Sequence, residues 1–205
     1  MTRLDHIPTF FVTALNPAAQ KIPVSVLGAT GVVGQRFVQR LVEHPFFEIR
    51  HLAASERSAG KRYDEACTWR IEGEGLDFAG LGDRIVEACD PKATSAPVVF
   101  SALDTEPARE LEPEFAARGA TVFSNAGAFR MTEDVPLLIP EVNPDHLELL
   151  AVQQQGRGYA RGGVLCNANC TTTMLVMAIA PLHACLLYTS PSPRDRTRSR
   201  MPSSA

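Results

Sequence analysis

The sequence lacks the features that define several large classes of protein. Its five cysteines include no Cys-x-x-Cys pair, which excludes a zinc ribbon and a thioredoxin motif, and no metal site is expected. Their odd number and irregular spacing fit a reducing cytoplasm better than a disulfide framework. No apolar run approaches the roughly 20 residues that a membrane span requires. The net charge of −3 provides no basic field. We therefore expect a cytoplasmic protein with neither a membrane nor a nucleic-acid partner.

The composition is that of a globular chain, but the two ends differ from the middle. Apolar residues make up 45% of the 205 residues and charged residues 21%, enough to bury a core. Residues 1–21 are expected to form a disordered leader. Residues 185–205 are rich in Ser, Pro and Arg and are expected to be a non-native disordered tail, because CLLYTSPSPRD and SRMPSSA resemble translated sequencing-library adapters. The native sequence is then expected to stop near Ala184.

A glycine-rich turn stands between a short strand pattern and a helix pattern. Val24–Leu27 is apolar and rich in β-branched residues, which predicts a buried strand. The segment Gly28–Gly34 follows with the spacing GxxGxxG, and apolar residues from Val33 to Val42 then recur at helical spacing. A strand, a glycine turn and a helix in this order open a dinucleotide-binding unit, in which the helix N-terminus binds a pyrophosphate.

The segment after the second predicted strand bears on the choice of cofactor. The strand is Ile49–Ala54, and Ser55-Glu56-Arg57-Ser58-Ala59-Gly60-Lys61 follows it. An NAD site places an acidic residue here, and Glu56 could have that role. However, Glu56 is flanked by two serine hydroxyl groups and by the basic residues Arg57 and Lys61. These groups suit the 2′-phosphate of NADP. We favour NADP.

The remaining pattern alternates strands with helices. Strands are predicted at Pro97–Leu103, Thr121–Ser124, Val135–Ile139 and Gly163–Cys166, and helices at Glu106–Arg118, at Pro144–Gln154 with Asn143 as N-cap, and after Cys170. This alternation predicts an α/β fold with a doubly wound parallel sheet of the Rossmann type. We expect the cofactor-binding domain to span residues 22–168 and a second domain to begin at residues 169–184.

Cys170 is the cysteine best placed for chemistry. It stands after a predicted strand and before a predicted helix, whose dipole would stabilise the thiolate. Asn169 and Thr171–Thr173 supply hydrogen-bond donors, and backbone N–H groups at that turn could form an oxyanion hole. The other cysteines, including Cys166 inside its predicted strand, are expected to pack as small apolar residues.

Several motifs together resemble one enzyme family. The segments SVLGATGVVGQRFVQRL, HPFFEI, ASERSAGKRY, VVFSAL, VFSNAGAFRM, EDVPLLIPEVNPDHLELL and NANCTT are similar to aspartate-semialdehyde dehydrogenases of the archaeal and fungal branch, from about Val24 to Ala184. That family reduces β-aspartyl phosphate with NADPH and releases phosphate and aspartate semialdehyde, for lysine, methionine and threonine synthesis. The resemblance implies the nucleophile Cys170, with Asn169 orienting the substrate and Arg130 binding the acyl phosphate. It also implies a cofactor loop of Gly28, Thr30, Gly31, Val32 and Val33, and contacts to the 2′-phosphate from Ser55, Arg57 and Ser58.

The resemblance also implies parts that the sequence does not match. Family members carry a second α/β domain after the cysteine helix, with a catalytic His, an Arg for the substrate carboxylate and most of the dimer contact. None of the five His residues here matches that His, and all five are expected to be solvated or capping residues. We therefore expect the full-length parent to be a homodimer or homotetramer and the 205-residue chain to be inactive.

Other functions remain open at this stage. A malonyl-CoA reductase and an N-acetyl-glutamyl phosphate reductase of the same lineage would also use a cysteine and NADPH. A non-catalytic NADP-binding module is an alternative of a different class. It predicts an unreactive Cys170, so the rate of thiol labelling separates it from an enzyme.

Overall fold

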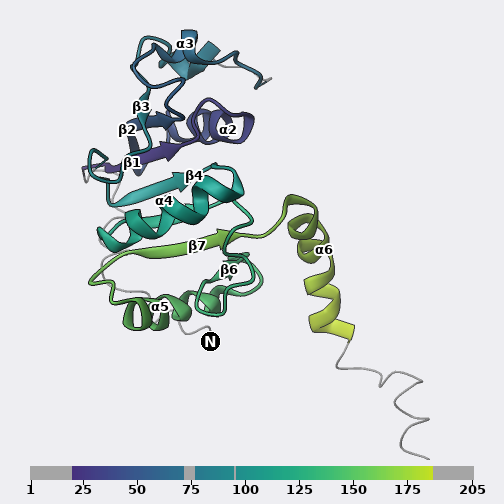
Figure 1. The fold of residues 1–205 in the computed structure, drawn as a ribbon. Helices are drawn as coiled ribbons and strands as arrows, with labels where there is room; N and C mark the ends of the chain where they lie inside the picture. Colours follow the sequence, from purple (N-terminus) through teal and green to yellow (C-terminus); the bar gives the residue numbers. More distant parts are fainter. Residues whose placement is uncertain (1–19, 72–76, 95, 187–205) are drawn as a thin grey trace, which may run out of the picture.

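The computed structural model describes residues 20–71, 77–94 and 96–186 (Figure 1). The predicted leader therefore lies outside the described residues up to residue 19, and the predicted tail lies outside them from residue 187. Cys185 and Leu186, which were assigned to the tail, continue the last helix. Within the described residues, no helix combines the length and hydrophobicity needed to cross a membrane. The same residues contain no cluster of three or more potential metal ligands.

The described strands form one parallel sheet in the order β3-β2-β1-β4-β5-β7-β6. A crossover at β1 reverses the direction of growth, which is the Rossmann arrangement and confirms the predicted doubly wound α/β fold. The strands are β1 (Ile22–Leu27), β2 (Phe47–Ala54), β3 (Glu87–Ala88), β4 (Val98–Ser101), β5 (Thr121–Ser124), β6 (Leu137–Leu138) and β7 (Gly163–Asn167).

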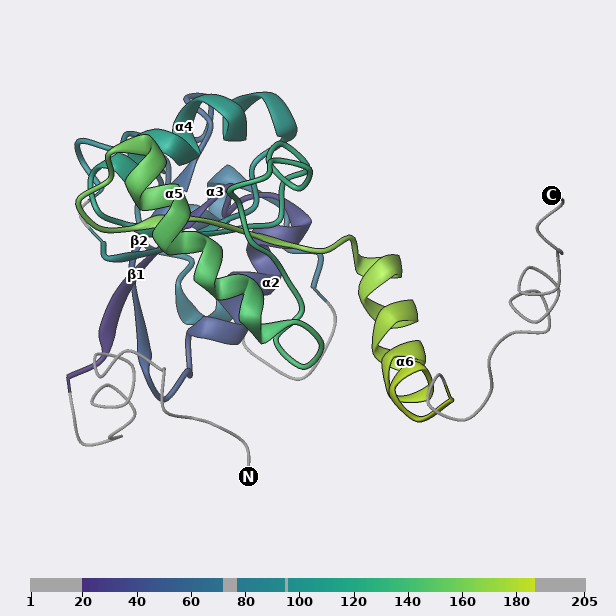
Figure 2. The ribbon, with the colours of Figure 1, turned by 90° about the horizontal axis from the view of Figure 1, so that it is seen from below.

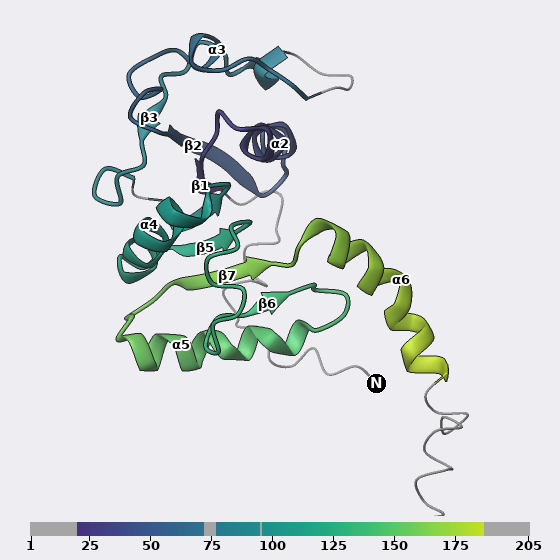
Figure 3. The same cartoon turned by 45° about the vertical axis from the view of Figure 1, so that its right-hand side comes forward.

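Helices cover both faces of this sheet and bury a separate core on each (Figures 1 and 3). On one face Val38 and Leu41 of α2 pack over Val24 and Val26. On the other face Phe115 of α4 packs over residues of the central strands. The helices are α2 (Val32–Leu41), α3 (Tyr63–Ala66), α4 (Thr105–Ala117), α5 (Leu149–Arg157) and α6 (Cys170–Leu186), with 3-10 turns at η1 (Asp77–Gly80) and η2 (Pro144–Glu148).

The predicted helix at Pro144–Gln154 is divided in the structure. The 3-10 turn η2 comes first, and the α-helix α5 begins only at Leu149. Asn143 stands at the N-cap position, but the prediction that its side chain caps the helix is wrong. Its Oδ1 accepts the N–H of Ile139 at 2.7 Å and its Nδ2 donates to the carbonyl of Leu137 at 2.8 Å. The side chain therefore closes the loop that precedes the helix.

An ion pair and a hydrogen bond hold peripheral segments. Asp134 and Arg157 form a bidentate pair at 2.6 Å, and this hydrogen bonding holds the pKa of the Asp134 carboxyl below its ordinary value. His51, which the sequence reading left as solvated or capping, instead lies 2.9 Å from a carboxylate oxygen of Glu87 and is only 17% exposed. This contact joins β2 to the edge strand β3.

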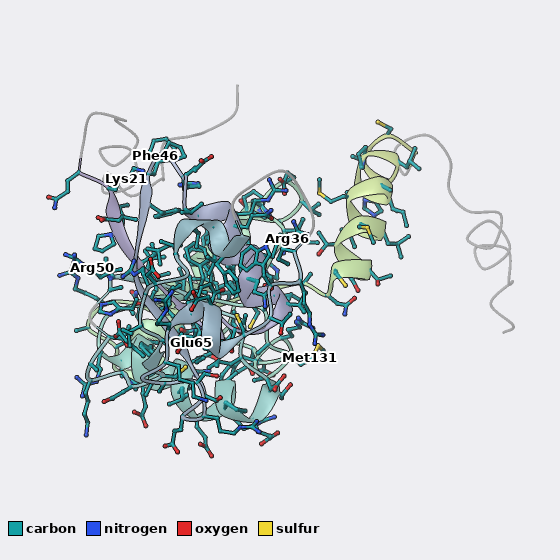
Figure 4. All side chains as sticks on the ribbon, turned by 90° about the horizontal axis from the view of Figure 1, so that it is seen from above. Lys21, Arg36, Phe46, Arg50, Glu65 and Met131 are labelled. Atoms are coloured by element: carbon teal, nitrogen blue, oxygen red, sulfur yellow. The ribbon has the colours of Figure 1, made fainter. Side chains whose placement is uncertain are left out.

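Helix α6 stands apart from the rest of the domain. It continues from the end of β7 and projects away from the sheet and its covering helices (Figures 1 and 2). Its 17 residues include no Asp, Glu, Lys or Arg. Large apolar side chains that are 40% to 69% exposed line it, namely Met174, Leu175, Met177, Ile179 and Leu182 (Figure 4). A helix that is apolar all round is normally buried, so α6 presents an unpartnered surface.

Candidate functional site at the carboxyl edge of the sheet

The loops that carry the predicted site residues leave the sheet at one edge. Leu27 of β1 pairs in register with Ala53 of β2 and with Ser101 of β4. Ser101 pairs in turn with Ser124 of β5, which pairs with Cys166 of β7. Because these strands are parallel, the segments that follow them emerge side by side. In open α/β sheets ligands bind at this carboxyl edge, near the strand where the order reverses.

The glycine turn after β1 is shaped by close backbone contacts. Gly28 has a φ of +72°, and a Cβ there would lie 2.5 Å from the carbonyl oxygen of Ala102. A Cβ on Gly34 would overlap the carbonyl oxygen of Gly28. The first position therefore requires glycine for its backbone conformation, and the second requires it so that α2 can pack tightly against the turn.

The turn exposes a set of backbone donors. The N–H of Gly31 donates to the carbonyl of Gly28 at 3.0 Å, and the first helical bond runs from Gln35 to Gly31. In the described part of the chain, no backbone hydrogen bond uses the N–H groups of Thr30, Val32 or Val33, and no side chain caps α2. Free N–H groups at a helix N-terminus, together with the helix dipole, attract an anion such as a phosphate. We call these three N–H groups the phosphate nest.

A pocket of about 290 Å³ opens beside the phosphate nest. It is lined by Thr30, Gly31, Val32, Gln35, Ala66, Cys67, Thr68 and Arg70. One wall is thus the glycine turn, and the opposite wall is the segment that follows α3. This second wall was not predictable from the sequence patterns.

Two buried side chains connect the turn to that wall. Gln35 is 1% exposed, and its Nε2 donates to the carbonyls of Thr30 at 2.9 Å and Thr68 at 3.0 Å. Its Oε1 accepts the N–H of Arg70 at 2.8 Å. The hydroxyl of Tyr63 donates to the carbonyl of Ala29 at 2.7 Å. Neither residue was predicted from the sequence, although a Gln on the apolar side of an amphipathic helix is a signal that could have identified Gln35.

The segment predicted to contact the 2′-phosphate begins at the end of β2. Ser55 and Arg57 are exposed and Ser58 is half-buried. The turn is held by bonds from the N–H groups of Ser58 and Ala59 to the carbonyl of Ser55, at 2.8 and 3.1 Å. Since β2 neighbours β1, this turn and the phosphate nest lie at the same edge of the sheet. The structure therefore brings together the two predicted parts of the cofactor site.

Arg130 joins the ends of β5 and β7. Its Nε donates to the carbonyl of Asn167 at 3.0 Å, and its Nη2 donates to the carbonyl of Asn125 at 2.6 Å. The amides of Asn125 and Asn167 also bond to each other at 2.6 Å. The side chain predicted to bind phosphate thus donates two nitrogens to the backbone, and among the described residues Nη1 has no hydrogen-bond acceptor.

Cys170 is exposed and is the first residue of α6. Asn169 caps this helix, because its Oδ1 accepts the N–H of Thr171 at 3.0 Å. The Sγ of Cys170 lies 4.0 Å from the Oγ1 of Thr171. Three strand spacings, roughly 14 Å, separate β7 from β1 in the sheet. The thiol and the phosphate nest therefore occupy one edge without touching each other.

The other cysteines of the domain differ from Cys170. Cys166 is fully buried in β7, as predicted, and burial raises the pKa of its thiol to about 11. Burial also raises the pKa values of the half-buried Cys67 and Cys89. These three thiols are poor nucleophiles at neutral pH, since the thiolate is the reactive form.

A buried carboxyl lies beneath the Asn125 loop. Glu112 of α4 is fully buried, and its Oε1 accepts the hydroxyl of Ser124 at 2.7 Å. The Oγ of Ser124 accepts the N–H of Ala126 at 3.1 Å. Burial raises the pKa of the Glu112 carboxyl. The sequence analysis did not identify Glu112, which supports the loop that carries Arg130.

Comparison with known proteins gives a consistent result. A family model described as semialdehyde dehydrogenase, NAD binding domain, matches residues 23–150. An aspartate-semialdehyde dehydrogenase of Archaeoglobus fulgidus is 53% identical over 159 residues, which cover 78% of this chain and 46% of that protein. The Saccharomyces cerevisiae enzyme of the same name is 42% identical over 170 residues, 80% of this chain and 46% of that protein.

The solved structures agree with the sequence comparisons. The crystal structure of aspartate semialdehyde dehydrogenase with NADP from Candida albicans superposes with a TM-score of 0.70 at 38% identity, covering 80% of this chain and 47% of that one. A type II enzyme from Vibrio cholerae, complexed with ASA, gives a TM-score of 0.59 at 25% identity, covering 82% of this chain and 44% of that one. The chain spans about half the length of the relatives that it matches.

Proposed function

The chain belongs to the semialdehyde dehydrogenase family, and on that premise we propose that it supplies the NADP-binding domain and the nucleophile of an aspartate-semialdehyde dehydrogenase. One observation carries the proposal. The exposed thiol of Cys170, at the start of a helix, and the phosphate nest lie at the same edge of the sheet. Relatives named aspartate-semialdehyde dehydrogenase support this substrate over the malonyl-CoA and N-acetyl-glutamyl phosphate alternatives.

The cofactor would be bound by the first half of the edge. The N–H groups of Thr30, Val32 and Val33 suit the pyrophosphate, and Gly28 and Gly31 keep that surface free of side chains. Ser55, Arg57 and Ser58 would bind the 2′-phosphate, for which the exposed guanidinium of Arg57 is well suited. When bound, NADPH supplies the hydride that reduces an acyl group to an aldehyde.

The acyl group would be held by the second half of the edge. The thiolate of Cys170 attacks the acyl carbon of β-aspartyl phosphate, the carbon–sulfur bond forms, and the bond to the phosphate oxygen breaks. The products of this step are a thioester on Cys170 and inorganic phosphate. The Nη1 of Arg130, which has no acceptor among the described residues, would bind the phosphate group.

Asn169 would act on the same step. Because its Oδ1 is committed to the N–H of Thr171, the amide orientation is fixed and the Nδ2 group remains as a donor. That donor is one residue from the nucleophile and can stabilise the negative oxygen that develops during attack.

The remaining finer assignments follow from the same proposal. The product, aspartate semialdehyde, would serve lysine, methionine and threonine synthesis in the cytoplasm. The full-length enzyme would be a homodimer or homotetramer. We expect no turnover from the 205-residue chain, because a general acid or base that contributes typically 10²–10⁴-fold is not identified in it.

A partial reaction therefore tests the proposal. The chain is incubated with β-aspartyl phosphate, quenched, and analysed by peptide mass spectrometry. We expect an acyl adduct on Cys170 in the wild type and in a Cys185→Ser control, and none in Cys170→Ser. Calorimetric titration with NADP and NAD is expected to show tighter binding of NADP. A chain that binds neither nucleotide, or that forms no adduct on Cys170, contradicts the proposed function.

A further inference from the structure

Two buried side chains bind carbonyl groups of the glycine turn. Tyr63, the first residue of α3, is 0% exposed, and its hydroxyl binds the carbonyl of Ala29. Gln35 binds the carbonyl of Thr30 from within α2. Both donors come from outside the turn and act on consecutive peptide groups.

The planarity of the peptide converts these contacts into an orientation of the N–H groups. In a trans peptide the carbonyl and the N–H of the next residue point in opposite directions. When Tyr63 holds the carbonyl of Ala29, the N–H of Thr30 must point away from Tyr63. That N–H belongs to the phosphate nest, so the tyrosine hydroxyl fixes the direction of one of its three donors.

The carboxamide of Gln35 is itself immobilised. Its two N–H donors bind the carbonyls of Thr30 and Thr68, and its oxygen accepts the N–H of Arg70. Three bonds to main-chain atoms leave the side chain one orientation, and they join both walls of the pocket. A change at Gln35 therefore alters the glycine turn and the segment at Thr68–Arg70 together.

We propose that Tyr63 is a positioning residue that orients the phosphate nest toward the pyrophosphate of the bound dinucleotide. Gln35 supports it by holding the next peptide of the turn, whose N–H at Gly31 donates to the carbonyl of Gly28 and is not itself part of the nest. The inference rests on the proposed function, because it assigns the pyrophosphate of NADP to the nest. Without the hydroxyl of Tyr63, the buried carbonyl of Ala29 loses its partner, and rotation of the peptide to satisfy it would turn an oxygen toward the phosphate. Burial raises the pKa of Tyr63, so its hydroxyl keeps its proton and remains a donor at neutral pH.

The test compares two ligands that differ in the pyrophosphate. Calorimetry measures the Kd of NADP, and ligand-observed NMR measures the Kd of adenosine 2′-phosphate, which lacks the pyrophosphate. For Tyr63→Phe and Gln35→Met we expect the Kd of NADP to rise about tenfold, the loss typical of one hydrogen bond to a charged ligand site. The Kd of adenosine 2′-phosphate is expected to stay within twofold of the wild type.

Matched variants control for general loss of stability. Gln39→Met makes the same chemical change one turn further along α2, and Tyr159→Phe removes a hydroxyl from a half-buried tyrosine after α5. Both are expected to leave the two Kd values unchanged. All titrations are made well below the melting midpoint of each variant, and Tyr63→Phe carries the test alone if Gln35→Met does not fold.

The outcomes separate the inference from the proposed function. If the Tyr63→Phe variant binds NADP as tightly as the wild type does, the positioning role is overturned and the proposed function stands. Equal weakening of NADP and adenosine 2′-phosphate in the variants also overturns it, because a structural defect would affect both ligands. A wild type that binds no NADP overturns the inference together with the proposed function.

Discussion

Replacement of glycine by alanine is expected to have opposite effects on stability at two positions of the domain. At Gly28 the φ of +72° and the carbonyl of Ala102 leave no room for a Cβ. Gly28→Ala is therefore expected to lower the free energy of unfolding by more than about 1 kcal/mol, as measured by urea denaturation. Gly156 lies within α5, and a Cβ there would meet nothing within 4 Å. Gly156→Ala is expected to raise the free energy of unfolding by about 0.5–1 kcal/mol. Equal effects of the two substitutions would contradict the close contact at Gly28.

The buried carboxyl of Glu112 makes the stability of the domain depend on pH. Because burial raises its pKa above the ordinary value of 4.5, the folded state binds the proton more tightly than the unfolded state. Stability from this proton is complete below the unfolded pKa and is lost as the pH rises through the raised folded value. The neutral Glu112→Gln variant has no such loss. Its stability relative to the wild type is therefore expected to increase from pH 4 to pH 8 in urea titrations.

A suitable control for that titration is Glu114→Gln, a change on the same helix. Its stability relative to the wild type is expected to vary less with pH, since the side chain of Glu114 is exposed. The free energy of unfolding of Glu112→Gln is compared with that of the wild type at each pH. If this difference is constant across the pH range, Glu112 does not carry the proton in the folded state.

At the residue scale the sequence identified candidates whose predicted roles depend on their own residue type and position. Cys170 was located by its place before a helix, and Gly28 by its place after a strand. Gln35, Tyr63 and Glu112 were not predicted, because their roles depend on partners elsewhere in the chain. The bond from Gln35 to Thr68 spans 33 positions, and the contact of Tyr63 with Ala29 spans 34. Local patterns carry no information about such pairs.

The exposed apolar surface of α6 is expected to make the chain self-associate in solution. Its exposed apolar side chains can be covered by a second α6, so we expect concentration-dependent self-association in light scattering coupled to size exclusion. A double change, Met174→Lys with Leu182→Lys, is expected to shift the population toward monomer. Met131 is 93% exposed on the body of the domain (Figure 4), and Met131→Lys provides the control. If Met131→Lys shifts the population toward monomer as much as the double change does, α6 is not the contact surface.

At the element scale the prediction succeeded where the pattern is long or the strand is central. Thr121–Ser124 agrees with β5 at both ends, and α4 differs from its prediction by one residue at each end. Pro113 lies inside α4 without ending it. The two-residue strand β3 and the short helix α3 were missed, since neither is long enough to show a period. Pairing with β2 holds β3, and burial of Tyr63 in the core holds α3.

For the whole molecule, ligand binding is expected to raise stability. A ligand that binds only the folded state stabilises it by about 2.7 kcal/mol at one hundred times its Kd. NADP is therefore expected to raise the melting temperature of the chain in a concentration-dependent way, and scanning fluorimetry measures this. Arg57→Met is expected to reduce the shift with NADP and to leave the shift with NAD unchanged. An identical reduction for both nucleotides would argue against a contact between Arg57 and the 2′-phosphate.

The architecture was the most predictable level. Alternating strands and helices allow few arrangements of a parallel sheet, and the glycine turn identifies the strand where the order reverses. The direction taken by α6 was not predictable, because an apolar stripe shows that a helix needs a partner but gives neither its direction nor its neighbour. The pocket wall at Thr68–Arg70 was not predictable either, because only the folded chain brings it to Gln35.

Cys170 is shared by two parts of the molecule, since the sheet ends just before it and α6 begins with it. The position of the sulfur therefore depends on the direction of α6 as well as on the end of β7. A partner that packs on α6 would also help to set where the thiol lies relative to the nucleotide loops.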